Sequence, residues 1–393
     1  MTDKQPNWDP LDPQTIEDPH ATYEHLRKTC PVAHSDNWDG FWALMCHKDI
    51  SNVTVDARTY INSVQNVVPH VGMGKRIPLH VDPPIHTFYR RVLFPPFQSE
   101  NIVALESTVR DFVSSLLEPI LEAGECDFIK EFTYLLPIQV LCAFLNIPQV
   151  EAQAVKDHSE RYTHALEYND RETLRAESDA LYALARRYVS HRKQNLLDPQ
   201  KDVTSALLMA RNDGNPIDEE IIVGCLRQLL VAGHVTLTLS IASAVFHLAS
   251  DPKLQTYLRE HPHRIPEAVE EFLRLYPPNQ AFARTTTRDV EINGQTIKEG
   301  EVVALLWISA NRDEEIFPNP HEFDLNRERN PHLAFGHGVH KCLGAPLARM
   351  EMRIALEELL SNTANFDLAF PTELMNTWPE YGPRVLPLRL ERR

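Results

Sequence analysis

Glycine is scarce in this chain, with 13 of 393 residues, whereas proline is common at 29. Tight turns in β-rich folds and the loops that wrap phosphate groups depend on glycine, so both are poor candidates here. Positive charge is also in short supply, because 39 Lys and Arg residues stand against 55 Asp and Glu residues, for a formal net charge of −16. Phosphate electrostatics dominate nucleic-acid binding, so we expect no nucleic-acid partner.

The six cysteines form no CxxC pair and no metal-finger spacing; they are Cys30, Cys46, Cys126, Cys142, Cys225 and Cys342. We therefore expect a reducing compartment rather than a disulfide framework. The spacing of a four-cysteine iron–sulfur cluster is also missing. If the chain performs redox chemistry, its electrons must come from a separate protein.

Long uninterrupted hydrophobic runs are missing as well. Residues 1–11 are polar and acidic rather than a basic segment followed by an apolar one, so we expect no signal peptide. The most apolar long stretch, Leu229–Ala249, contains Gly233, two histidines and several Ser and Thr residues. A membrane span of about 20 residues tolerates few such groups, so this stretch indicates a helix buried inside a soluble protein. We expect a cytoplasmic protein without membrane contact.

Helical periodicity covers much of the chain. Expected helices cover residues 19–29, 102–123, 128–145, 171–197, 218–250, 266–276 and 346–360, and expected strands cover 41–45, 290–292, 295–297 and 302–308. Asn293-Gly294 between two short strands is typical of a tight hairpin, and residues 312–341 have the composition of a long ordered loop. No Gly- or Ser-rich linker divides the chain, so we expect one domain, 1–393, that is mainly α with a small β region.

The most informative segment runs from Phe335 to Gly344 and presents Cys342 just before the last expected helix. Its three glycines let the backbone turn tightly and approach a flat, bulky group. A helix N-terminus stabilises a thiolate and lowers the pKa of the thiol, and loop N–H groups can donate to the sulfur. A thiolate ligand to heme iron needs these features. A lone cysteine is more often an inert core thiol, which suits Cys142 and Cys225 but leaves the three glycines unexplained.

The segment closely resembles the heme-binding loop of cytochromes P450, whose pattern is Phe-x-x-Gly-x-His/Arg-x-Cys-x-Gly. Phe335, Gly338, His340, Cys342 and Gly344 all match this pattern. The resemblance extends from about residue 20 to the C-terminus, with the motifs in the family's order. It implies the mainly helical cytochrome P450 fold and a heme b cofactor (iron protoporphyrin IX) whose iron is held by Cys342.

Glu271-Phe272-Leu273-Arg274 matches the family's Glu-x-x-Arg, and the i,i+3 spacing places both charged side chains on one face of a helix. In the family this pair locks with an arginine of the later loop, which is Arg327 here. Taken alone the motif is a surface ion pair in most proteins. The resemblance assigns it structural support.

The resemblance also supplies partners for the two heme propionates, namely His86 and Arg90, one helical turn apart, together with Arg284 and His340. Buried propionates need cationic donors, because the desolvation of an unpaired carboxylate is costly. An ordinary surface charge is the alternative for Arg90 and Arg284.

Ala232-Gly233-His234-Val235-Thr236 is similar to the family's oxygen-site pattern, Ala/Gly-Gly-x-Asp/Glu-Thr, in the long central helix. The resemblance implies that Gly233 leaves room for oxygen and that Thr236 hydrogen-bonds it or orders a water; these are the expected catalytic residues. Val235 replaces the acid of the pattern and cannot relay protons. His234 lies about 100° around the helix from Val235, and we expect it to face the helix bundle.

The resemblance predicts a monooxygenase that inserts one oxygen atom of O2 into a small hydrophobic substrate. Electrons would come from a ferredoxin or flavodoxin-type donor with its NAD(P)H reductase, steered by a basic patch of Arg90, Arg91, Lys341 and Arg349. Two alternatives remain open because the acid is missing. One is a P450 with atypical chemistry, such as peroxide-driven oxygenation, aromatic coupling or nitric oxide reduction. The other is a non-enzymatic heme-binding protein.

The expected substrate pocket includes Val235, Asn279, Ala281 and Phe282. By resemblance its other walls come from residues 62–80, 160–180, 229–236 and 377–381. We expect an apolar floor, with Asn279 able to orient a polar substituent. No motif specifies the substrate itself.

Overall fold

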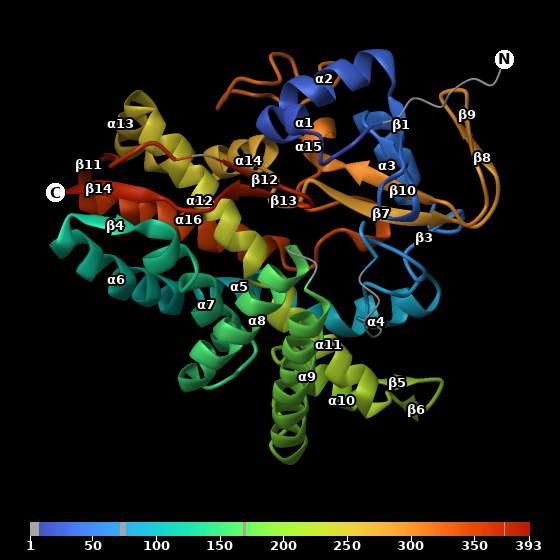
Figure 1. Ribbon diagram of the computed structural model, residues 1–393. Coiled ribbons are helices and arrows are strands. Elements are labelled where there is room, and N and C mark those ends of the chain that lie inside the picture. Colours follow the sequence, from blue (N-terminus) through green and yellow to red (C-terminus); the bar gives the residue numbers. More distant parts are fainter. Residues whose placement is uncertain (1–7, 71–75, 168–169, 373) are drawn as a thin grey trace.

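The structure is a computed structural model that describes residues 8–70, 76–167, 170–372 and 374–393. It is mainly helical, with small sheets at opposite sides of the molecule (Figure 1). The helices are α1 (Pro13–Glu17), α2 (Pro19–Thr29), α3 (His47–Val55), α4 (Ile85–Leu93), α5 (Ser99–Val103), α6 (Glu106–Ala123), α7 (Leu136–Phe144), α8 (Ala152–Glu167), α9 (Arg171–Gln194), α10 (Val203–Met209), α11 (Glu219–Ala232), α12 (Val235–Ser250), α13 (Pro252–Glu260), α14 (Ile265–Leu275), α15 (Trp307–Ala310) and α16 (Ala345–Asn362).

The largest sheet has the strand order β1-β2-β10-β7-β3. The strands of the structure are β1 (Val32–Ser35), β2 (Phe41–Leu44), β3 (Tyr60–Ile61), β4 (Glu125–Asp127), β5 (Arg211–Asn212), β6 (Asn215–Pro216), β7 (Ala281–Thr286), β8 (Val290–Ile292), β9 (Gln295–Ile297), β10 (Val302–Leu306), β11 (Thr363–Leu368), β12 (Leu374–Thr377), β13 (Glu380–Pro383) and β14 (Pro387–Arg392). In Figure 1, β1, β3 and β7–β10 lie at one side of the molecule, and β4, β11 and β14 lie at the other. Alternation along β2 sends Phe41 and Ala43 into one hydrophobic cluster and Trp42 and Leu44 into another, so both faces of the sheet are covered.

The two helices that position the site, α12 and α16, contact each other near the middle of the molecule (Figure 1). Their inward faces belong to the main hydrophobic core, through residues such as Ile241, Val245, Ile354 and Leu359. The C-terminus of α16 leads into β11, which pairs with β14. The site therefore rests on helices that are held on several sides.

Several sequence-based boundaries were correct. Asp218 caps α11 by accepting the Glu220 N–H, the helix that follows ends at Ser250, and α14 starts beside Pro266. The Asn293-Gly294 hairpin is present, with both residues at positive φ, as the tight turn requires. The C-terminal strands β11 to β14 were not anticipated, because their alternation is short and interrupted by proline and glycine.

Three predicted helices are interrupted and one predicted strand is shorter. The expected helix over 102–123 breaks at residues 104–105, between α5 and α6. The expected helix over 128–145 divides into a π-helical segment, Ile129–Thr133, and α7. The expected helix over 218–250 breaks between α11 and α12, where His234 has non-helical angles of φ −125° and ψ −45°. The strand expected over 302–308 ends at Leu306, and the backbone then turns into α15. Hydrophobic periodicity does not register such breaks, because the side-chain pattern continues across them.

The stretch Glu219–Ser250 is long and apolar enough to cross a membrane, but 61% of its most apolar 18 residues are buried inside the protein. The core helix of a globular protein can be equally long and apolar. The burial agrees with the expectation that this stretch packs within the protein.

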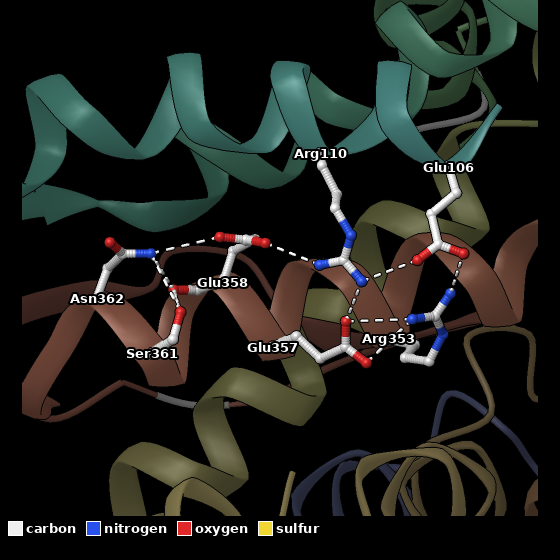
Figure 2. Close-up of polar contacts among 7 residues, drawn as sticks. All are labelled: Glu106, Arg110, Arg353, Glu357, Glu358, Ser361 and Asn362. Carbon is white, nitrogen blue, oxygen red and sulfur yellow. Dashed lines mark hydrogen bonds and ion pairs between the residues drawn. The ribbon is translucent and has the colours of Figure 1, made fainter. Parts of the chain in front are cut away.

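A network of charges joins α6 to α16 (Figure 2). Arg110 of α6 binds Glu357 at 2.6 Å and Glu358 at 2.8 Å on α16, and also Glu106 at 2.9 Å on its own helix. Arg353 of α16 returns the contact, binding Glu106 at 2.9 Å. Each helix therefore contributes an arginine that pairs with one or two glutamates of the other helix. These ion pairs hold α16, which begins shortly after Cys342, against α6.

The Glu271–Arg274 pair is a buried junction rather than a surface bridge. Arg274 and Glu271 are 0% and 1% exposed, and they meet in two hydrogen bonds of 2.8 and 2.7 Å. Arg327 donates from its Nε to Glu271 at 3.2 Å, as predicted. Arg274 further donates to the carbonyls of Asn311, Pro320 and Glu322. The junction thereby fixes the long loop that leads to Cys342 against α14.

Candidate heme site

A cavity of about 1390 Å³ lies between the Cys342 loop, the α11–α12 break and the β7 edge of the sheet. Most of the predicted site residues line it: Gly233, Val235, Thr236, Asn279, Phe282, Arg284, Phe335, His340, Cys342 and Gly344. Residues from three separate parts of the sequence thus meet in one place. Of the pocket walls expected by resemblance, residues 71–75 and 168–169 lie outside the described residues.

The Cys342 loop closes on itself before α16 begins. The Cys342 N–H donates to the Phe335 carbonyl at 2.8 Å, so the two ends of the segment lie side by side. Gly338 has a φ of +70°, and a Cβ there would overlap the Thr54 carbonyl oxygen, so only glycine fits. Cys342 itself is exposed to the cavity and sits just before the N-terminus of α16. The thiol is therefore presented toward the cavity by a loop with little freedom.

The expectation of a lowered thiol pKa does not hold for the chain on its own. Burial raises the pKa of the Cys342 thiol, and this outweighs the lowering by the Gly344 N–H, the Arg90 and Arg349 charges and the Ala345 N–H. The helix N-terminus acts in the predicted direction but is the weaker influence. Coordination to a metal ion deprotonates a thiol outright, so these donors would serve the bound thiolate.

A cluster of four basic side chains stands beside this loop. The rings of His86 and His340 lie 4.1 Å apart between centroids, and the Arg90 guanidinium donates to the Lys341 carbonyl at 2.8 Å. Arg284 is 5% exposed and donates to the carbonyl of Ala283, its neighbour in the chain. His86 and Arg90 do not themselves line the cavity; they lie directly behind His340 and Lys341.

Burial disfavours the charged forms of His340 and Arg284 in this cluster, and neighbouring positive charges add to this effect at His340. Burial lowers the pKa of His340 to about 2, with further lowering by His86, Arg284 and Arg90, and burial lowers the pKa of Arg284 to about 10. Asp82 is the described carboxylate that acts on Arg284, and its two oxygens already accept the N–H groups of Asn62 and Ser63. The Nε2 atom of His340 is buried without a hydrogen-bond partner among the described residues. Such a cluster needs an added anion.

The residues present therefore fit heme b. Cys342 would hold the iron, and the orphan Nε2 of His340 together with Arg284 would hold the two propionates, with Arg90 and His86 adding positive charge from behind. Phe335, which packs under the Arg349 guanidinium at 4.6 Å, and Gly344, whose added Cβ would lie 3.9 Å from the sulfur, would form the wall beside the ligand.

The oxygen-site residues lie where the central helix breaks. A Cβ at Gly233 would come within 2.8 Å of Leu141 in α7, so glycine here permits close helix packing as well as space in the cavity. Thr236 lies in the first turn of α12 and lines the cavity, with its Oγ1 3.5 Å from the Ala232 carbonyl. Val235 lines the same wall, so the cavity lacks an acid at that position.

His234 faces the helix bundle, as expected. It is fully buried, and its Nε2 lies 2.6 Å from the Ser159 hydroxyl of α8. Burial lowers the pKa of His234 to about 3, so the ring is neutral. It cannot replace the missing acid.

Ala281 departs from the expected pocket. Alternation along β7 puts Phe282 and Arg284 on the cavity face and Ala281 and Ala283 on the opposite face, where they join the cluster around Trp378. Asn279 lines the cavity and is half-buried. The cavity wall at β7 is therefore aromatic and cationic.

Several cavity residues were missed by sequence reasoning. Glu351 of α16 lines the cavity and is buried, with Oε2 lacking a partner among the described residues. Burial raises the pKa of Glu351 well above its usual value. Arg76 and Tyr162 also line the cavity, within the walls expected over 62–80 and 160–180, whereas Arg227, which stacks on Tyr162, was not expected. For Glu351 and Arg227 there was a usable signal, since each is a charged residue in an apolar helical stretch.

A cysteine thiol on a glycine-bearing loop, facing a large cavity beside an unneutralised basic cluster, defines a heme-thiolate protein. Comparison with known proteins identifies the family. Residues 145–376 match the family model described as Cytochrome P450. The chain is 32% identical to "Putative cytochrome P450 YjiB" of Bacillus subtilis, over 91% of each chain, and 31% identical to "Cytochrome P450-terp" of a Pseudomonas species, over 94% and 93%. It superposes on the structure of CYP109Q5 from Chondromyces apiculatus with a TM-score of 0.88 at 28% identity, over 98% and 99% of the chains.

The chain belongs to the cytochrome P450 family. It has the cytochrome P450 fold, and the family's enzymes are oxidoreductases that incorporate oxygen.

Proposed function

We propose that this protein is a heme-thiolate monooxygenase that inserts one oxygen atom of O2 into a hydrophobic organic substrate, with residues 1–393 acting as a single heme domain. The observation that carries the proposal is the meeting of the Cys342 thiol and the basic cluster at one cavity. When bound, heme b supplies the activation of oxygen. A relative named "Mycinamicin IV hydroxylase/epoxidase", from Micromonospora griseorubida, is 32% identical and supports this chemistry.

The chain's own residues have separable tasks in this proposal. Cys342 ligates the iron, and His86, Arg90, Arg284 and His340 neutralise the propionates. The Thr236 hydroxyl lines the cavity at the helix break, where it can hold a proton or a water. The apolar walls orient the substrate and exclude bulk water, which strengthens every polar contact in the site.

Electrons are proposed to arrive from a separate ferredoxin or flavodoxin-type donor and its NAD(P)H reductase. The predicted basic patch is smaller than expected, because Glu270 binds Arg349 at 2.6 and 2.8 Å, and Arg90 is half-buried against Lys341. Arg91 and Lys341 remain exposed beside the Cys342 loop, with the exposed apolar side chains of Phe94 and Val339. Two positive charges and two exposed apolar side chains suit a weak, transient contact with an acidic electron-transfer protein. A cytoplasmic location, supported by six unpaired cysteines, completes the proposal.

The ligand assignment is tested by the spectrum of the ferrous–CO complex. The wild type should show the red-shifted Soret band of a thiolate heme, Cys342→His should lose that band, and Cys142→Ser should keep it. An unchanged thiolate spectrum in Cys342→Ser would refute the site. Turnover is tested separately with a ferredoxin and its reductase. Substrate-stimulated NAD(P)H oxidation with one labelled oxygen atom from ¹⁸O2 in the product is expected, whereas a carrier or sensor would give neither.

A further inference from the structure

One wall of the cavity carries an arginine that forms no ion pair with a described carboxylate. Arg76 lines the cavity, and its Nε is buried without a hydrogen-bond partner among the described residues. Its Nη2 lies 3.0 Å from Nε2 of His80. However, Nδ1 of His80 accepts the Arg76 backbone N–H at 3.3 Å, so in the neutral ring Nε2 carries the proton and donates it to Asn66 at 3.0 Å. The contact with Arg76 therefore joins two donors.

A second guanidinium lies behind the same wall. Arg227 of α11 is 1% exposed and donates to the Ser178 hydroxyl at 3.3 Å, while its Nε and Nη1 atoms are buried without partners among the described residues. It stacks over the Tyr162 ring at 4.4 Å, and that ring lines the cavity. Arg227 thus adds positive potential to the wall without reaching the cavity.

Two other buried arginines of the protein each have a carboxylate partner. Arg192 pairs with Asp202 at 3.2 Å, and Arg274 pairs with Glu271 at 2.7 Å. Burial lowers the pKa of Arg76, and the charge of Arg227 lowers it further; the other groups that act on it are Tyr162 and Tyr182. No carboxylate appears among these described groups. A buried arginine beside a half-buried one, without an anion, is costly, and an anionic ligand would remove that cost.

The remainder of the cavity specifies what else this ligand must be. Leu79, Leu174, Leu229, Val235 and Phe282 line it with apolar surface. Two more arginines that line the cavity, Arg171 and Arg175, are exposed and form no ion pair with a described side chain. In a chain with a net charge of −16, this local excess of cations is a property of the cavity rather than of the composition.

We propose that the substrate is a lipophilic carboxylic acid, whose carboxylate binds the Arg76 guanidinium and whose apolar body lies along Leu229 and Phe282 toward Thr236. A planar guanidinium fork matches a carboxylate in two parallel hydrogen bonds, and a single cation at the cavity surface suits a monoanion. Arg227 is a positioning residue that raises the potential at Arg76. That the acid is oxidised rests on the proposed function, whereas the binding of the acid at Arg76 does not.

The test compares lipophilic carboxylic acids with primary amides of the same carbon skeleton, by titrating the heme spin state of the purified holoprotein. The wild type should bind each acid at least tenfold more tightly than its amide, which is about 1.4 kcal/mol. Arg76→Gln should remove this preference while leaving amide affinity within about threefold of the wild type. Arg76→Lys, which keeps the charge and loses the fork, should fall between the two. Arg389→Gln, at an exposed ion pair with Glu125, is the matched control and should behave as the wild type.

Thermal melting provides a readout that needs no turnover. Ligand-free Arg76→Gln should melt at or above the wild-type temperature, because a buried unpaired charge is removed, and the acids should raise the wild-type melting temperature more than that of the variant. Equal wild-type affinity for acid and amide, or an acid preference that persists in Arg76→Gln, would overturn the proposal. If the CO spectrum and turnover are normal but acids are not preferred, this inference fails alone. If acids stabilise the wild type through Arg76 but the thiolate spectrum is missing, the proposed function fails instead.

Discussion

Glu271→Gln should destabilise the protein more than any substitution at an exposed ion pair. Glu271 accepts hydrogen bonds from Arg274 twice, from the Asp324 N–H at 3.0 Å, from Arg327 and from Asn330 at 3.1 Å. Removing one partner of a buried ion pair costs about 3–5 kcal/mol, because the other charge stays buried. At roughly 2.1 cal/mol/K per residue, the unfolding entropy of a 393-residue chain is about 0.8 kcal/mol/K. The melting temperature should therefore fall by about 4–6 °C.

The assay is calorimetric melting of the holoprotein at neutral pH, with heme content measured on the same samples. Glu220→Gln, at the exposed Arg186–Glu220 pair, is the control and should shift the melting temperature by about 1 °C or less. Heme content should also fall in Glu271→Gln, because the junction holds the loop that leads to Cys342. A melting temperature within 1 °C of the wild type, with normal heme content, would show that the junction can be relaxed without loss.

Three other outcomes follow from the structure. Val235→Asp should raise the fraction of NAD(P)H converted to product and reduce hydrogen peroxide release, since a positioned acid contributes at least roughly 10²-fold to proton transfer; unchanged or lower coupling would mean that other groups already supply protons. Arg110→Ala should cost roughly 1–2 kcal/mol in urea unfolding, more than Arg389→Ala, and a loss equal to that control would reduce the α6–α16 network to ordinary surface pairs. Burial would raise the pKa of Glu270, but bonds from Arg349 and His332 outweigh it and lower the pKa to about 2. This stabilisation is present above about pH 4.5 and is lost as the pH falls toward 2, so acid unfolding of Glu270→Gln should depend less on pH in that window, and an unchanged slope would contradict it.

The parts of the site that sequence reasoning located are those whose chemistry is encoded in short, local spacing. The Cys342 loop has its glycines, aromatic residue and cysteine within ten residues, and Gly336 and Gly338 have the positive φ that favours glycine. The Asn293-Gly294 turn and the Asp218 cap are of the same kind. Glu271 and Arg274 share one helix face by their spacing alone. Such features are readable because their partners lie within a few residues.

Other features depended on neighbours far along the chain and could not be read in this way. At the helix break, Gly233 packs against Leu141 and His234 contacts Ser159. No local sequence pattern indicates these contacts, because both partners lie far away in the sequence. Arg349 looked like part of a charged face until the fold placed Glu270 beside it.

Sequence by itself indicated the class of protein and the cysteine that we propose as the iron ligand, because these depend on local geometry and on motifs kept in sequence order. Tertiary structure decided the electrostatics of the cavity. Burial raises the pKa of the Cys342 thiol and of the Glu351 carboxyl and lowers the pKa of Arg76, and burial depends on what the rest of the chain packs around each group. A charge near water costs little wherever it lies in the sequence, whereas a buried charge depends on the few groups within reach, and only the folded chain determines which groups those are.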